Sequence, residues 1–97
     1  MNLHLHPEAS YEMAKSAVYY DEQSTGLGEK FLAEIERSLS MILENPYIWA
    51  ADKKGRRKYR VRRFPYQVIY RIHYETVYIL AIAHTKRYPG YWENRDI

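Results

Sequence analysis

Residues 64–83 read FPYQVIYRIHYETVYILAIA, and their period of two predicts a pair of antiparallel strands joined by a tight turn. The first strand has two alternating faces, one with Val68, Tyr70, Ile72 and Tyr74 and the other with Gln67, Ile69, Arg71 and His73. We expect Phe64-Pro65 to form the corner before this strand and Glu75-Thr76 the turn after it. Val77–Ala83 is apolar on both faces apart from Tyr78, which predicts a central place in the sheet.

The strand pattern continues on the N-terminal side of this hairpin, over Tyr59–Arg63. Two sets of residues alternate there, Tyr59, Val61 and Arg63 on one face and Arg60 and Arg62 on the other. We therefore expect a third strand with a strongly cationic face. Residues 46–55 before it are predicted to form a loop that encloses Trp49.

Residues further upstream repeat with the period of a helix. A first helix is expected from Pro7 to about Gln23, with apolar residues at spacings of three and four: Met13, Ala14, Ala17 and Val18. Ser24-Thr25-Gly26 interrupts it, and Asn45-Pro46 ends a second helix, because the residue before proline disfavours the helical conformation. The second helix has one apolar stripe, formed by Phe31, Leu32, Ile35, Leu39, Ile42 and Leu43. Its charged residues are expected to face away from the stripe or flank it: Glu29, Lys30, Glu34, Glu36 and Arg37.

The chain is short enough to form one domain over residues 1–97. Residues 2–6 alternate polar and apolar residues like a short strand. The expected order is therefore a strand, an antiparallel helical hairpin and a three-stranded antiparallel meander, which together make a small α+β domain. The chain has no cysteine, which excludes disulfides, thiolate zinc sites and cysteine nucleophiles.

Charge is distributed unevenly along the chain. Residues 1–52 contain three basic and nine acidic residues, whereas residues 53–97 contain twelve basic and three acidic ones. Eight of those twelve lie in Lys53–Arg63, KKGRRKYRVRR, without a carboxylate between them. A strand edge protected against aggregation needs fewer like charges, so we favour an anionic partner for this segment. Charge alone leaves open whether that partner is a nucleic acid or an acidic protein segment.

The sequence also bears on the compartment of the protein. No apolar run approaches the roughly 20 residues that span a bilayer. The first residues, MNLHLHPE, lack the basic and apolar regions of a secretory signal. We therefore expect a cytoplasmic protein without a membrane partner.

Common catalytic motifs are absent from the sequence, which has no G-x-S-x-G, no P-loop and no H-E-x-x-H. His4 and His6 could share a strand face and hold a metal ion. No third ligand is evident nearby, so surface histidines are the simpler interpretation and no metal is expected. His73 is most simply a half-exposed residue of the sheet.

His84 directly follows the apolar strand and precedes a basic and aromatic tail that contains Lys86, Arg87, Tyr88, Tyr91 and Arg95. Histidine, arginine and tyrosine side chains can together perform metal-free RNA cleavage, by moving the protons and stabilising the charged transition state. Composition alone favours a structural interpretation, in which His84 caps the sheet while Tyr91 and Trp92 pack the tail onto the core.

Several short motifs occur in a set order along nearly the whole chain. They are AVYYDE at 17–22, Gly26-Leu27-Gly28 followed by Phe31 and Glu34, Asn45-Pro46, Arg56-Arg57, Phe64-Pro65-Tyr66 with Ile69-Tyr70, and IAHTKRYPGYW at 82–92. No single motif is specific, but their combination and order resemble the ParE/RelE superfamily of toxins from bacterial type II toxin–antitoxin systems.

The resemblance implies two helices packed on a twisted antiparallel sheet, no cofactor, and a cognate antitoxin protein. The C-terminal segment of such an antitoxin wraps the toxin and neutralises it within a hetero-oligomer. Two activities occur in the superfamily. RelE-type members cut mRNA in the ribosomal A site, whereas ParE-type members poison DNA gyrase and are not known as nucleases. A third interpretation is a relative that binds its antitoxin but is not toxic.

Ribonuclease members commonly place a catalytic arginine near the start of the strand after the corner, where this chain has Gln67. The ending His84–Pro89 is also similar to ParE-like relatives, so we favour gyrase poisoning, which would make the protein a non-enzyme. As a metal-independent ribonuclease, its candidate catalytic residues would be Arg62, Arg71, His84, Arg87 and Tyr91. The candidates for binding the target or the antitoxin are Lys53, Lys54, Arg56, Arg57, Lys58, Arg60, Arg62, Arg63, Lys86 and Arg87.

Overall fold

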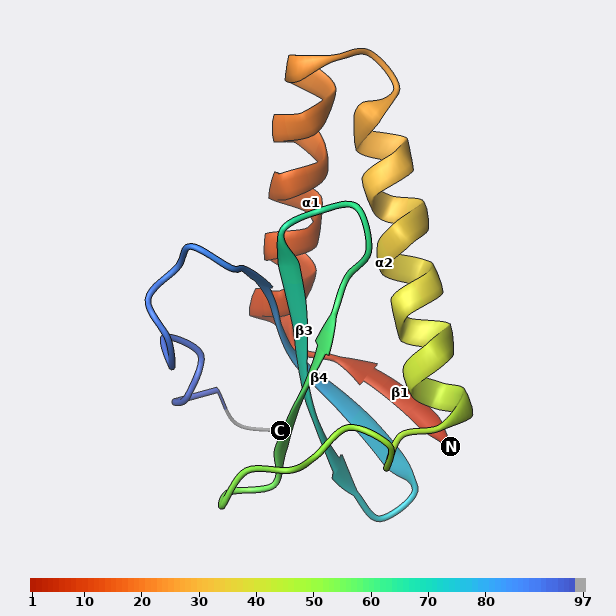
Figure 1. The fold of residues 1–97 in the computed structure, drawn as a ribbon, viewed down its shortest axis with the longest axis vertical. Coiled ribbons are helices and arrows are strands. Elements are labelled where there is room, and N and C mark those ends of the chain that lie inside the picture. Colours follow the sequence, from red (N-terminus) through yellow and green to blue (C-terminus); the bar gives the residue numbers. More distant parts are fainter. Residues whose placement is uncertain (96–97) are drawn as a thin grey trace.

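The computed structural model describes residues 1–95, and its elements follow the predicted order. These elements are β1 (Asn2–Leu5), α1 (Pro7–Gln23), α2 (Leu27–Glu44), β2 (Arg56–Arg60), β3 (Tyr66–His73) and β4 (Thr76–His84). The strands form one sheet in the order β1-β4-β3-β2, and the two helices form an antiparallel hairpin (Figure 1). The predicted α+β architecture is therefore confirmed. The last two residues of the expected tail, Asp96 and Ile97, lie outside the described residues.

The strand β4 is central, as its apolar sequence predicts, because it pairs with β3 on one side and with β1 on the other. The antiparallel meander of β2, β3 and β4 is also confirmed. In contrast, β1 runs parallel to β4, with Leu3 beside Val77 and Leu5 beside Ile79. The sheet is therefore mixed and not wholly antiparallel. Its β2–β3 and β3–β4 pairs are antiparallel, and its β1–β4 pair is parallel.

The first strand of the meander begins and ends earlier than predicted, at Arg56–Arg60 and not at Tyr59–Arg63. Val61 is buried, but its backbone N–H already bonds to the Tyr66 carbonyl oxygen across the corner. Arg63 has a left-handed backbone, with φ of 71°, so it is not on one face with Tyr59 and Val61. The alternation in the sequence continues beyond the last residue of β2 because Val61 still packs into the core.

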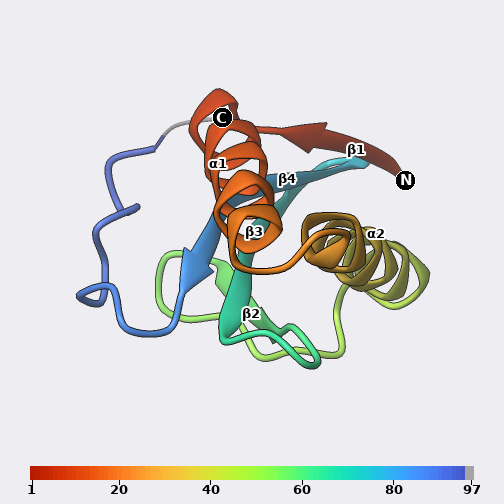
Figure 2. The ribbon, with the colours of Figure 1, turned by 90° about the horizontal axis from the view of Figure 1, so that it is seen from above.

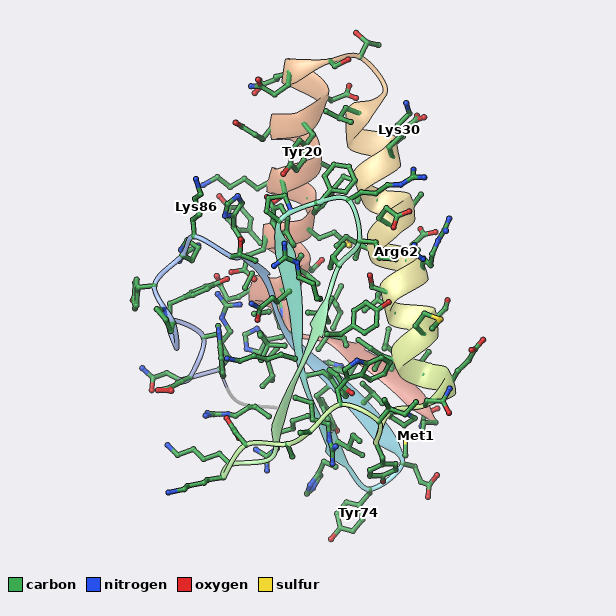
Figure 3. All side chains as sticks on the ribbon, viewed as in Figure 1. Met1, Tyr20, Lys30, Arg62, Tyr74 and Lys86 are labelled. Carbon is green, nitrogen blue, oxygen red and sulfur yellow. The ribbon has the colours of Figure 1, made fainter. Side chains whose placement is uncertain are left out.

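The turn between β3 and β4 differs from the prediction by one residue. Tyr74 has a φ of 53°, is 85% exposed and projects from the end of the sheet (Figure 3), so it does not share the buried face with Tyr70. Thr76 already pairs with His73 as the first residue of β4. A register shift next to Ile69 and Tyr70 leaves Leu80 as an extra residue in β4, a β-bulge that period-two alternation does not reveal.

The helices bury their apolar faces against the sheet, and α2 follows its predicted stripe with Phe31, Ile35 and Ile42 fully buried. Two details differ. Val18 is 59% exposed and Ala14 is exposed, because α1 packs through Ala9, Met13, Ala17 and Tyr20. Glu34, one of the charged residues expected to face away from the stripe or flank it, is buried. Within the described residues, neither helix is both long and apolar enough to span a membrane.

The core has two parts, one on each face of the sheet. The larger part lies between the sheet and the helices and includes Phe31, Ile35, Val68, Tyr70 and Ile79. The smaller part contains Ile69, Leu80, Ala81, Ala83 and Trp92. The chain after β4 passes on the side of the sheet opposite α2 (Figure 2), which brings Trp92 onto this smaller part.

Candidate functional site

The register of the sheet divides its side chains between two faces. Val68, Tyr70, Val77 and Ile79 point toward the helices and are buried. The opposite face, which we call the open face, carries His4, Arg56, Lys58, Arg60, Gln67, Arg71, His73 and Tyr78. The four described strands contain no Asp or Glu, so the open face is cationic.

The cations of β2 on the open face lie along one edge of the sheet. The Arg56 guanidinium is 5.3 Å from the centre of the Trp92 ring, and the Lys58 ammonium is 5.8 Å from it. Arg56 also donates a hydrogen bond to the Glu93 carbonyl oxygen, whereas Arg60 is exposed. The buried Trp92 ring therefore supports two cations of this row on its surface.

Arg57 differs from its neighbours because it points to the helix side of the sheet. Its guanidinium donates to the carbonyl oxygens of Tyr47 and Trp49, and it lies 5.3 Å from the centre of the Tyr47 ring. Arg57 was predicted to bind the target or the antitoxin. Within the chain, its contacts tie β2 to the loop after α2.

The remaining cations of the 53–63 segment lie in turns. Lys53 and Lys54 are exposed in the turn before β2, where the Asp52 carboxylate accepts the backbone N–H groups of Lys54 and Arg56. These hydrogen bonds, the one from Arg56 first, hold the pKa of Asp52 below its ordinary value. Arg62 and Arg63 are exposed in the corner between β2 and β3.

A second group of charges lies where α1, β4 and the tail meet. The Glu12 carboxylate accepts two hydrogen bonds of 2.9 Å from Arg95, one of 2.6 Å from the Tyr91 hydroxyl and one of 3.0 Å from the Ile82 backbone N–H. Arg95 also donates to the Leu80 carbonyl oxygen. We call Glu12, Tyr91 and Arg95 the Glu12 cluster. It satisfies backbone groups of β4 beyond the end of β1 and fixes the tail to α1.

Tyr91 lies between two arginines. Its ring centre is 3.8 Å from the Arg87 guanidinium and 5.1 Å from the Arg95 guanidinium. Burial, and next the hydrogen bond to Glu12, raise the pKa of the Tyr91 hydroxyl far above its ordinary value. The hydroxyl therefore stays protonated at neutral pH and is already donated to Glu12, so it is unsuited to act as a general base.

His84 lies at the end of β4 on the helix side, beside Tyr66, with 5.1 Å between the ring centres. Its Nδ1 atom accepts the backbone N–H of Lys86. An open hollow of about 320 Å³ lies next to it. The residues that line the hollow come from α1, β3, β4 and the tail: Glu12, Lys15, Ser16, Tyr19, Tyr66, Ile82, His84 and Arg87.

The structure does not bring the five candidate ribonuclease residues together. Three of them, His84, Arg87 and Tyr91, line one small hollow of about 110 Å³ beside the tail, and His84 and Arg87 also line the larger hollow. Arg71 is on the open face, opposite Tyr78 of β4 and across the sheet from His84. Arg62 lies in the β2–β3 corner and Tyr91 is held by Glu12. Figure 3 shows Arg62 and Lys86, the neighbour of Arg87, on different sides of the view.

The two N-terminal histidines have structural contacts. His4 packs against Tyr78, with 5.3 Å between the ring centres. His6 lies after the end of β1 and caps α1, because its Nδ1 atom accepts the Glu8 backbone N–H. Among residues 1–95, no group of three or more His, Cys, Asp or Glu side chains is placed to hold a metal ion.

Comparison with known proteins identifies the family. The family model described as ParE toxin of type II toxin-antitoxin system, parDE, matches residues 3–89. The chain belongs to the ParE toxin family. A search of curated proteins found no match to this member of the family.

Solved structures agree with the ParE assignment at the level of fold. The chain is similar to a chain from the "Chromosomal ParDE TA system from P. aeruginosa", with a TM-score of 0.74 and 18% sequence identity. The alignment covers 89% of this chain and 97% of the other. At this identity the likeness concerns the arrangement of helices and strands.

Some residues of this ParE member were missed by the sequence analysis although a signal for them exists. Glu12, Ser16 and Tyr19 are spaced by four and three residues, which places them on one face of α1. The spacing of apolar residues does not reveal these three, because they are polar or aromatic. Tyr66 could not be paired with Ser16 from sequence, since 50 residues separate the two hydroxyl groups that bond at 2.9 Å.

Proposed function

We propose that this ParE family member is a toxin that poisons DNA gyrase by binding and that a cognate antitoxin neutralises it. The observation that carries the proposal is the separation of Arg62 and Arg71 from the other candidate catalytic residues. Arg71 lies on the open face and Arg62 in the β2–β3 corner, outside the small hollow that His84, Arg87 and Tyr91 line, and the hydroxyl of Tyr91 is engaged by Glu12. A protein that acts by binding does not need these groups to converge, whereas a ribonuclease does.

The charges of the molecule support a binding role. Arg60, Arg62 and Arg63 are exposed on the open face and the adjoining corner. No carboxylate occurs within the described strands beside them. Uncompensated cations of this kind attract an anionic partner and accelerate its association. The DNA-bound form of gyrase is such a partner.

The proposed antitoxin would cover apolar side chains that this chain leaves exposed. Met41, Tyr47 and Ile48 are 41%, 61% and 65% exposed at and after the end of α2, and Val18 and Tyr19 are more than half exposed on α1. A disordered segment that folds on binding buries such side chains. Acidic residues in that segment would pair with the exposed cations, so we expect a hetero-oligomer of toxin and antitoxin.

A cleavage-complex assay tests the proposal. Purified protein is incubated with DNA gyrase, ATP and supercoiled plasmid, and linear DNA is scored after denaturation. We expect linear DNA that depends on the protein and disappears when the antitoxin encoded beside it is added. The double variant Arg60→Gln/Arg62→Gln should produce less linear DNA, whereas Lys30→Gln, at an exposed position of α2, should match the wild type.

A folded, growth-arresting protein that yields no linear DNA would overturn gyrase poisoning. Ribosome-dependent cleavage of mRNA would then be tested by primer extension on a translated message. Under that mechanism His84→Ala and Arg87→Ala would abolish cleavage without unfolding the protein. A folded protein that binds its antitoxin but does not arrest growth would contradict both activities.

A further inference from the structure

We propose that the hollow between α1 and the end of β4 is a phosphate-binding site. This inference goes beyond the proposed function and does not depend on gyrase as the target. The hollow has a volume of about 320 Å³, which lies at the small end of the range for ligand sites. Its walls come from three parts of the chain, so a ligand in it would contact α1, the sheet and the tail together.

The polar groups available in the hollow are donors. Lys15 and Arg87 line it from α1 and from the tail, and both side chains are cationic. The Nδ1 atom of His84 accepts the Lys86 backbone N–H, so neutral His84 carries its proton on Nε2, where it can be donated. The Tyr66 hydroxyl donates its proton to the Ser16 hydroxyl oxygen. The proton of the Ser16 hydroxyl is then available for donation to a ligand.

The single carboxylate in the wall does not oppose an anion. Glu12 already accepts four hydrogen bonds, which matches the roughly four lone-pair sites of a carboxylate. Arg95 supplies two of them and neutralises its charge. The charges of Lys15 and Arg87 therefore remain uncompensated in the hollow, and the site is complementary to a group with several negatively charged oxygens.

The rest of the wall favours a phosphate that carries an organic group. Tyr19 is 54% exposed at the hollow, and Ile82 provides an apolar surface. An aromatic ring beside two cations can stack a nucleobase whose phosphate the cations hold. The phosphate can come from a free mononucleotide or from a nucleic-acid strand, and both offer the same chemistry to the site.

Titration of the 97-residue protein with defined probes tests this site. The probes are AMP, adenosine, inorganic phosphate and a single-stranded oligonucleotide, followed by ¹H–¹⁵N correlation spectra. We expect AMP to shift the backbone amides of Lys15, Ser16 and His84, inorganic phosphate to do so more weakly, and adenosine not to do so. A response to the oligonucleotide without a response to AMP would identify a strand, and not a free nucleotide, as the source of the phosphate.

Matched variants connect the shifts to the hollow. Lys15→Gln changes an exposed residue and should weaken AMP binding by about tenfold, as expected for a lost charge-assisted hydrogen bond. Lys86→Gln removes a neighbouring exposed cation that does not line the hollow and should leave the affinity unchanged. Equal binding of adenosine and AMP, shifts confined to the open face, or no shift with any phosphate probe would overturn the proposal.

Discussion

The 53–63 segment and the 84–95 segment are both rich in basic and aromatic residues, yet the structure treats their charges differently. In the 84–95 segment Arg95 is held by Glu12, and Arg87 stacks on Tyr91. In the 53–63 segment Arg60, Arg62 and Arg63 are exposed, with no carboxylate in the described strands beside them. Two other arginines of this segment are bound within the chain, since Arg57 donates to two backbone carbonyl oxygens and Arg56 to one.

This difference separates Arg95 and Arg57, whose donors are engaged within the chain, from exposed arginines that remain available to a partner. A guanidinium held by a carboxylate or by carbonyl groups already uses its N–H donors in hydrogen bonds within the chain. Its loss leaves those acceptors unpaired. An exposed guanidinium contributes little to stability because water screens it. Substitution of an engaged arginine should therefore lower the stability of the protein more than its binding to a partner. Substitution of an exposed arginine should lower binding more than stability.

The largest effect is expected from Glu12→Ala. Removal of the carboxylate leaves the mostly buried Arg95 without its partner and the Tyr91 hydroxyl and Ile82 N–H without an acceptor. We expect the free energy of unfolding to fall by about 3 kcal/mol. Urea unfolding followed by circular dichroism measures this loss. Glu8→Ala, an exposed carboxylate one turn earlier in α1, is the control, and an equal loss in both variants would contradict the structural role of the cluster.

The next largest effect is expected from Tyr91→Phe. This variant loses only the hydrogen bond to the charged Glu12, at a cost of about 2 kcal/mol. Because folding raises the pKa of Tyr91 above its ordinary value of 10.0, its contribution is complete below that pH and is lost as the pH rises further.

Wild-type stability should therefore fall more steeply above pH 10 than the stability of Tyr91→Phe. Burial raises the pKa of Tyr20 to about 12, and Tyr20 is still present in the variant. The stability of Tyr91→Phe should therefore also fall above pH 10, but less than that of the wild type. Thermal unfolding between pH 8 and pH 11 measures both slopes. Equal slopes for the two proteins would show that Tyr91 titrates as it does in the unfolded chain.

A smaller effect is expected from Arg57→Gln, which tests an arginine of the 53–63 segment that is bound within the chain. It removes the hydrogen bonds to the Tyr47 and Trp49 carbonyl oxygens, and we expect a loss of about 1 kcal/mol. Arg60→Gln, at an exposed position of the same strand, should change the stability by less than about 0.5 kcal/mol. Chemical unfolding of both variants decides whether the two arginines differ as their contacts indicate.

The smallest effect on stability is expected from Arg60→Gln/Arg62→Gln, which should instead change binding. If the partner is a polyanion, the dependence of log affinity on log salt should become shallower by about 2, near 0.9 for each cation. Fluorescence anisotropy with labelled duplex DNA between 50 mM and 200 mM salt measures the slope. A slope equal to that of the wild type would exclude these two arginines from the binding surface.

Most of the architecture could be predicted from the sequence because it depends on local periodicity. The α2 stripe and the double-sided apolar run of β4 give the helical layer and the centre of the sheet. The parallel pairing of β1 with β4 and the β-bulge at Leu80 could not be predicted, since both depend on which strands meet. The candidate sites were likewise predictable only where they depend on local sequence. The cationic segment is visible in sequence, but the faces to which Arg56 and Arg57 point are set by the register.

The sequence by itself therefore determined the order of helices and strands, the family and the excess of positive charge after residue 52. Only the tertiary structure decided which charges are paired. Glu12 meets Tyr91 and Arg95 across 79 and 83 residues, and Ser16 meets Tyr66 across 50. Local periodicity reflects the side-chain directions of one element, whereas a hydrogen bond between distant residues requires that two elements have already packed together.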